Sequence, residues 1–207
     1  MIPTIRKQNP QRRKFPRKQG GFSLIELLIA VIIIGVLAAI AIAGFGTGAT
    51  TNARAKSIIN TATKLSNNWI YVATGLGVSS DITDAEDDTT GIFDSADDTV
   101  LELLMDNDGT ILSDDKLETR FANLGIRSLR DLGSWDDIDG DNIDELVVDT
   151  YEVTMQTDTN GDNIQVVFTD VPQEVYDVIL DDRGPGVVSY VDDDDDGAEE
   201  LYINFQP

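Results

Sequence analysis

The chain has 207 residues and a formal net charge of −23, from 15 Lys and Arg residues against 38 Asp and Glu residues. It contains no Cys and no His, which excludes disulfides, thiolate or imidazole metal sites and catalytic triads built on those side chains. A bound metal ion would have to be held by oxygen atoms, which favours Ca²⁺ or Mg²⁺. The acidic balance argues against direct binding of nucleic acid.

Charge divides the chain into three parts. Residues 1–21 contain seven basic residues and no acid, and Glu26 is the only acid before Asp81. Residues 81–207 contain 37 acids and five basic residues. This order of a basic leader, a nearly uncharged middle and an acidic body suggests a membrane-targeting segment followed by an exported domain.

The uncharged middle contains an apolar run in which every residue from Leu27 to Ala43 is apolar or Gly. The segment 22–45, as a helix, is long enough to cross the hydrocarbon core of a bilayer, about 30 Å thick. The basic cluster before it is expected to stay in the cytoplasm. Two simpler interpretations are a single-pass anchor and a cleaved secretory signal peptide, for which Ala41-Ile42-Ala43 offers a cleavage site.

Glu26 is the one charged residue of this segment. A carboxylate in an apolar spanning helix is costly and marks a functional site. No positive side chain lies within reach in the same segment. A new α-amino group would serve as its partner if the chain were cut just before Phe22, with Gly20 and Gly21 left on the leader.

The run Gly21-Phe22-Ser23-Leu24-Ile25-Glu26-Leu27-Leu28 resembles the class III signal of type IV pilins and pseudopilins. The resemblance implies that a prepilin peptidase cleaves between Gly21 and Phe22 and that Phe22 is N-methylated. It implies that Glu26 pairs with the N-terminal amine of a neighbouring copy during assembly. It also implies a bacterial inner-membrane precursor, an assembly platform in that membrane, and an extracellular pilus or a periplasmic pseudopilus built from copies of the chain.

Four segments are expected. Residues 1–21 are the cleaved leader, 22–50 the transmembrane and filament-core helix, 51–76 an amphipathic helix, and 77–207 the acidic head. In the amphipathic helix, apolar residues spaced four and three apart form one face: Ile58, Ala62, Leu65, Trp69 and Val72. Gly75 and Gly77 are expected to end it.

Glycines also interrupt the long helix near its middle, at Gly44, Gly46 and Gly48. Pilins often carry a Pro in this region. Because each Gly weakens a helix by roughly 1 kcal/mol relative to Ala, a bend or a locally melted turn is expected here in place of the Pro.

The head is expected to combine short helices with antiparallel strands. Helices are predicted at Thr99–Met105 and at Asp115–Leu124, the second with Ser113 as its N-cap. Residues rich in Val, Thr, Tyr and Phe predict two strand pairs, which are 146–157 with 164–171 and 187–191 with 200–205. The predicted fold is α+β, a long helix packed on an antiparallel sheet, as in the pilin fold that the resemblance implies.

Two acidic loops place oxygen atoms at alternate positions, as in the D-x-D-x-D-G calcium loops of extracellular β proteins that they resemble. The predicted Ca²⁺ ligands of the first loop are Asp137, Asp139, Asp141, the Ile143 carbonyl and Glu145. Those of the second are Asp192, Asp194, Asp196, the Ala198 carbonyl and Glu200. Five consecutive Asp residues would repel one another without a cation, and bound Ca²⁺ would stabilise a head that lacks disulfides.

A third loop has a weaker version of this pattern, with Asp158, Asn160 and Asp162 as metal candidates. The alternative for all three loops is that Asp, Asn and Gly simply favour turns. For the third loop the turn is the preferred interpretation.

The predicted function is that of a structural subunit of an extracellular type IV pilus-like filament. Two alternatives stay open, a pseudopilin of a type II secretion system and a membrane-anchored, calcium-binding adhesion module. The sequence has no nucleophile elbow, phosphate loop, dinucleotide fingerprint or zinc motif, so it is not expected to be an enzyme.

Overall fold

The computed structural model describes residues 23–95, 97–107, 109–136, 145–192 and 199–207, without the side chains of residues 41–47, 136 and 192. The chain divides into two units, residues 1–45 and 46–207, and each is described by itself. The first unit contributes the beginning of helix α1 (Leu24–Leu76), and the second contributes the rest of that helix and the head.

Helix α1 continues without a break through Gly44, Gly46 and Gly48. The melted turn expected there is therefore absent from the single chain. The physical reason is that Gly lowers helix propensity but keeps its backbone N–H, so the helical hydrogen bonds continue where a Pro would interrupt them.

The buried face of α1 in the second unit is the predicted one. Ile58, Ala62, Leu65, Trp69 and Val72 are all fully buried. The helix ends at Leu76 because Gly77 takes a left-handed conformation, with φ of 73°. The N–H of Val78 then donates to the carbonyl of Ala73 at 3.0 Å, which is the Schellman arrangement of a helix C-terminus.

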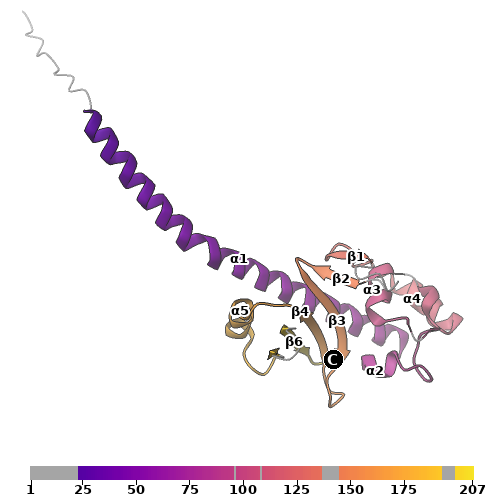
Figure 1. The fold of residues 1–207 in the computed structure, drawn as a ribbon. Coiled ribbons are helices and arrows are strands. Elements are labelled where there is room, and N and C mark those ends of the chain that lie inside the picture. Colours follow the sequence, from indigo (N-terminus) through magenta and orange to yellow (C-terminus); the bar gives the residue numbers. More distant parts are fainter. Residues whose placement is uncertain (1–22, 96, 108, 137–144, 193–198) are drawn as a thin grey trace, which may run out of the picture. The chain divides into compact units, whose positions relative to one another are not determined.

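The head contains a six-stranded antiparallel sheet, and the predicted α+β fold is confirmed (Figure 1). The strand order is β1-β2-β3-β4-β6-β5. The strands are β1 (Ser134–Asp136), β2 (Glu145–Val148), β3 (Tyr151–Thr157), β4 (Ile164–Thr169), β5 (Val188–Asp192) and β6 (Glu199–Phe205). Both predicted pairs, β3 with β4 and β5 with β6, are formed.

The prediction of one strand over residues 146–157 was wrong. A turn at Asp149 and Thr150 divides this segment into β2 and β3, which pair with each other. Asp149 has a φ of 61°, a conformation that Asp tolerates better than most residues. The Val and Tyr residues that flank the turn favour strands, and the turn contains no Gly or Pro. The sequence pattern therefore did not indicate a turn here.

Five short helical segments lie in the described part of the head. They are α2 (Ile82–Ala85), α3 (Val100–Asp106), the 3₁₀ turn η1 (Gly109–Ile111), α4 (Asp115–Leu124) and α5 (Gln173–Arg183). Helix α4 has the predicted bounds, but its N-cap is Asp114 and not Ser113. The Asp114 carboxylate accepts a hydrogen bond from the N–H of Lys116 at 2.8 Å, whereas the Ser113 hydroxyl donates to the carbonyl of Ile92 at 3.1 Å.

The core of the head lies between α1 and one face of the sheet. Alternate sheet residues join the buried face of α1 in this core, among them Val153, Val166, Phe168, Leu201 and Ile203. The opposite face of the sheet is polar, and a chain of side-chain amides crosses it from Gln156 through Gln165 to Asn204. In Figure 1 the strands β3 and β4 lie between α5 and the group α2, α3 and α4.

Candidate functional site

The first turn of α1 is organised by Ser23. Its hydroxyl oxygen accepts a hydrogen bond from the backbone N–H of Glu26 at 3.2 Å, and its carbonyl accepts from Glu26 and Leu27 at 3.1 and 3.2 Å. This is the first half of a capping box, in which Ser at the N-cap satisfies the N–H three residues later. The sequence interpretation did not assign a role to Ser23, although the spacing Ser-x-x-Glu is the signal for it.

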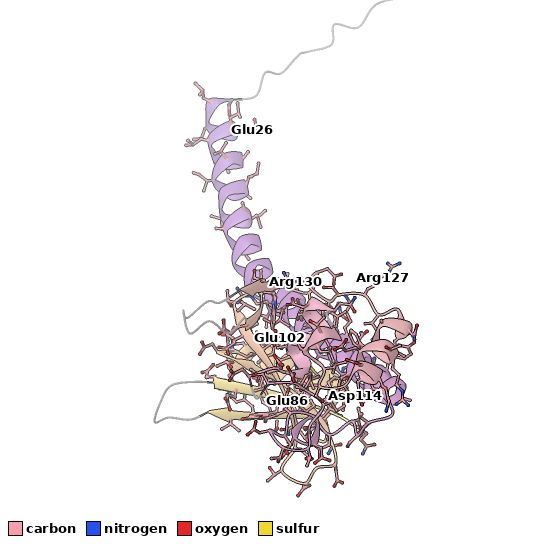
Figure 2. The ribbon with its side chains drawn as sticks, turned by 90° about the vertical axis from the view of Figure 1, so that its right-hand side faces the viewer. Glu26, Glu86, Glu102, Asp114, Arg127 and Arg130 are labelled. Carbon is pink, nitrogen blue, oxygen red and sulfur yellow. The ribbon has the colours of Figure 1, made fainter. Side chains whose placement is uncertain are left out.

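The carboxylate of Glu26 is exposed at this end of the helix (Figure 2). In the part of the chain that the structure describes, its side chain makes no hydrogen bond or ion pair. An acid in the first turn is favoured by the positive end of the helix dipole. Its carboxylate remains available to a cationic group from outside the described residues.

The next turns of α1 present a long apolar surface. Twelve Leu, Ile and Val side chains are 51–90% exposed, and they are Leu24, Ile25, Leu27, Leu28, Ile29, Val31, Ile32, Ile33, Ile34, Val36, Leu37 and Ile40. Exposed apolar surface of this extent marks an interaction site. Among the described helices, none meets the combination of length and apolarity needed to cross a membrane.

Several predicted site residues lie outside the described residues. They are the cleavage-site pair Gly21 and Phe22 and the loop residues Asp137, Asp139, Asp141, Ile143, Asp194, Asp196 and Ala198. Within the described ranges, no group of three acidic side chains is placed to hold a metal ion. The described members of the two predicted sets of calcium ligands are Glu145, Asp192 and Glu200.

Both acidic loops connect neighbouring antiparallel strands. Asp136 pairs with Glu145 at the end of β1 and β2, and Asp192 pairs with Glu199 at the end of β5 and β6. Because β5 runs opposite to β1, these two strand ends lie at opposite ends of the sheet.

Glu200 already has a partner within the chain. Its carboxylate accepts a hydrogen bond from the hydroxyl of Tyr202, and this bond, with partial burial, raises the pKa of Tyr202 to about 12. One of the two oxygen atoms of Glu200 is thus engaged by Tyr202 within the chain.

The third loop is a hydrogen-bonded turn. One oxygen of Asp158 accepts from the N–H groups of Asp162 and Asn163 at 2.8 and 3.1 Å, and the other accepts from the Asn163 amide at 2.8 Å. These bonds, the Asn163 amide first, lower the pKa of Asp158. The arrangement favours the turn interpretation.

A further carboxylate lies deeper in the head. Glu86 accepts a hydrogen bond from the N–H of Val100 at 2.8 Å, at the start of α3. Burial raises the pKa of Glu86, and this hydrogen bond partly opposes the effect. The sequence offered no signal for this position.

The comparisons with known proteins bear on the N-terminal part of the chain. No curated protein and no solved structure was found to match the chain. Residues 16–42 match the family described as the prokaryotic N-terminal methylation motif. The chain thus carries, around Gly21, Phe22 and Glu26, the N-terminal methylation motif that is the processing signal of type IV pilins and pseudopilins.

Proposed function

We propose that this protein is a structural subunit of a type IV pilus-like filament. The observation that carries the proposal is the set of twelve exposed Leu, Ile and Val side chains between Leu24 and Ile40, within the region that matches the methylation motif. In water this surface is unfavourable, at about 25 cal/mol per Å² of apolar area. Packing against the same segment of other copies would remove it from water.

Glu26 supports the same function. Its carboxylate would be costly inside a dry bundle of helices unless a positive group paired with it. Cleavage between Gly21 and Phe22 would create an α-amino group at the helix end where Glu26 lies. The amine of a neighbouring copy would then neutralise the carboxylate and set the register between copies.

The proposed processing and assembly of the chain take place in two stages. The precursor is held at the bacterial inner membrane, where a prepilin peptidase removes residues 1–21 and Phe22 is methylated. An assembly platform then adds the processed chain to a filament outside the cell. A periplasmic pseudopilus of a type II secretion system is the second candidate, because the same motif serves both.

The test begins with mass spectrometry of the chain isolated from cells. We expect an N-terminus at Phe22 that carries one added methyl group. A chain that begins at Met1 or at Gly44 would contradict the proposal. Electron microscopy of intact cells then separates long surface filaments from a pseudopilus confined to the periplasm.

Calcium binding by the two acidic loops is a separate proposal, supported by their position between paired strand ends. Because a ligand that binds only the folded state stabilises it by about 2.7 kcal/mol at one hundred times its dissociation constant, Ca²⁺ should raise the melting temperature. The variant Asp139→Asn/Asp141→Asn should lose part of this increase, whereas Asp158→Asn should keep it. A melting temperature unchanged by a chelator would refute the proposal.

A further inference from the structure

The outer face of α1 in the head carries positive charge and no negative charge. Lys56, Asn60, Lys64, Asn67 and Tyr71 follow one another on the side of the helix away from its buried face. No acid occurs on α1 after Glu26. We call Lys56 and Lys64 the basic face.

Lys56 and Lys64 are exposed and make no ion pair or side-chain hydrogen bond to any described residue. Lys56 lines a surface groove together with Asp181 and Asp182 of α5, without an ion pair to either. Some other basic side chains of the head do have partners, whereas Lys116 and Arg127 have none among the described residues. Arg130 pairs with Asp106, and Arg120 donates to the carbonyl of Leu76. Figure 2 shows Arg130 at the surface of the head.

The remainder of the head has the opposite charge. Residues 81–207 contain 37 acids against five basic residues. Like charges repel when two such heads approach each other. A positive group at a contact between heads would offset this repulsion, and the basic face holds two of the eight basic residues of the processed chain.

We propose that the basic face of one copy binds the acidic head surface of the next copy in the filament. This inference rests on the proposed function, because packing of the apolar segments holds neighbouring copies together and so supplies their carboxylates at high effective concentration. A nucleic acid or an anionic lipid surface would meet the same repulsion from the 37 acids without this high effective concentration. A second copy of this chain is therefore the partner that the charges favour.

The basic face would also fix how neighbouring heads are oriented. Lys56 and Lys64 are eight residues apart on one helix, which places them about 12 Å apart along its axis at roughly 1.5 Å per residue. Two separated cations require two separated acidic groups on the partner. Complementary charges at fixed positions suppress other registers between the copies.

The first experiment reverses the charge of the basic face. The double variant Lys56→Glu/Lys64→Glu, made in the full chain, should lower the yield of sheared filaments by about tenfold or more, because two attractive pairs become repulsive. The matched control is Lys116→Glu, an exposed Lys at the start of α4, and it should leave the yield unchanged. Immunoblots of the processed pool check that each variant is stable before assembly.

The second experiment identifies the partner directly. The processed chain has only three Lys residues, Lys56, Lys64 and Lys116. A carbodiimide joins an amine to a carboxylate that touches it, without a spacer. In filaments mixed from isotopically labelled and unlabelled copies, we expect cross-links from Lys56 or Lys64 to an acid of residues 81–207 in a different copy.

The outcomes separate the two proposals. Normal filaments of Lys56→Glu/Lys64→Glu, or cross-links confined to single chains, would overturn the basic face as a contact between copies and leave the filament intact. Loss of the double variant from the membrane fraction before assembly would assign the face to lipid headgroups and overturn the inference. A wild-type chain processed at Phe22 that forms no filament would overturn the proposed function as well.

Discussion

The two halves of α1 use the same residue types for different purposes. Leu65 in the head half is fully buried, whereas Leu37 in the N-terminal half is 60% exposed. In the head half, apolar residues follow the three-and-four spacing that one sheet face can cover. In the N-terminal half, apolar residues surround the helix, so no single surface of the chain could cover them all. The first pattern stabilises a fold, and the second supplies an interface.

Matched Leu substitutions test this comparison with the largest expected effect. Leu65→Ala should lower the free energy of unfolding of the head by about 2–5 kcal/mol, because it leaves a cavity between α1 and the sheet. Leu37→Ala removes the same atoms from an exposed site and should leave the free energy of unfolding of the head unchanged. Thermal melting of both variants measures the difference, and equal destabilisation would contradict the division of the helix into two roles.

Glu26→Gln should impair filament assembly and leave the stability of the head unchanged, whereas Leu65→Ala lowers that stability. Loss of the carboxylate should reduce filament yield by about a hundredfold, since a neutral amide cannot compensate a buried amine. The melting temperature of the head should stay the same, because the side chain of Glu26 makes no hydrogen bond or ion pair to any described residue. Sheared filaments quantified by electron microscopy are the readout, and wild-type yield would remove the assembly role of Glu26.

Gly77, just after the end of α1, and Gly48, within the helix, are expected to respond with opposite signs. Gly77→Ala should destabilise the head by about 1–2 kcal/mol, because a side chain is strained at its φ of 73°. Gly48 lies within the helix, and an added Cβ there would meet nothing within 4 Å. Gly48→Ala should therefore be neutral or stabilising by up to about 1 kcal/mol. Urea unfolding of the two variants compares them.

The smallest expected effect is the pH dependence that Glu86 contributes. Its pKa in the folded state is raised by burial above the ordinary value of 4.5, so the folded state holds the proton more tightly than the unfolded state. Its contribution to stability is therefore largest below pH 4.5 and falls as the pH rises through the folded pKa. Glu86→Gln stays neutral and can still accept from Val100. Its stability relative to wild type should increase from about pH 4.5 towards neutrality, and a difference independent of pH would contradict this.

Local patterns were sufficient for most elements. The buried face of α1, the bounds of α4 and the pairing of β3 with β4 were predicted correctly. The division of 146–157, the cap at Asp114 and helix α5 were not. Helix α5 has no side-chain cap at Pro172, so the local start signal was weak. Its buried Val175 and Ile179 show that contacts with the core stabilise it.

The sequence by itself was enough to recognise the N-terminal methylation motif. The proposed cleavage site, the proposed methylation site and Glu26 lie within one short stretch, so no folding is needed to recognise the motif at residues 16–42. Only the tertiary structure decided which basic side chains are left without partners. The partners of Arg130 and Arg120 lie 24 and 44 positions away along the chain. Lys56 and Lys64 have no partner among the described residues. Such pairings depend on how the fold brings distant residues together, and spacing along the sequence does not contain that information.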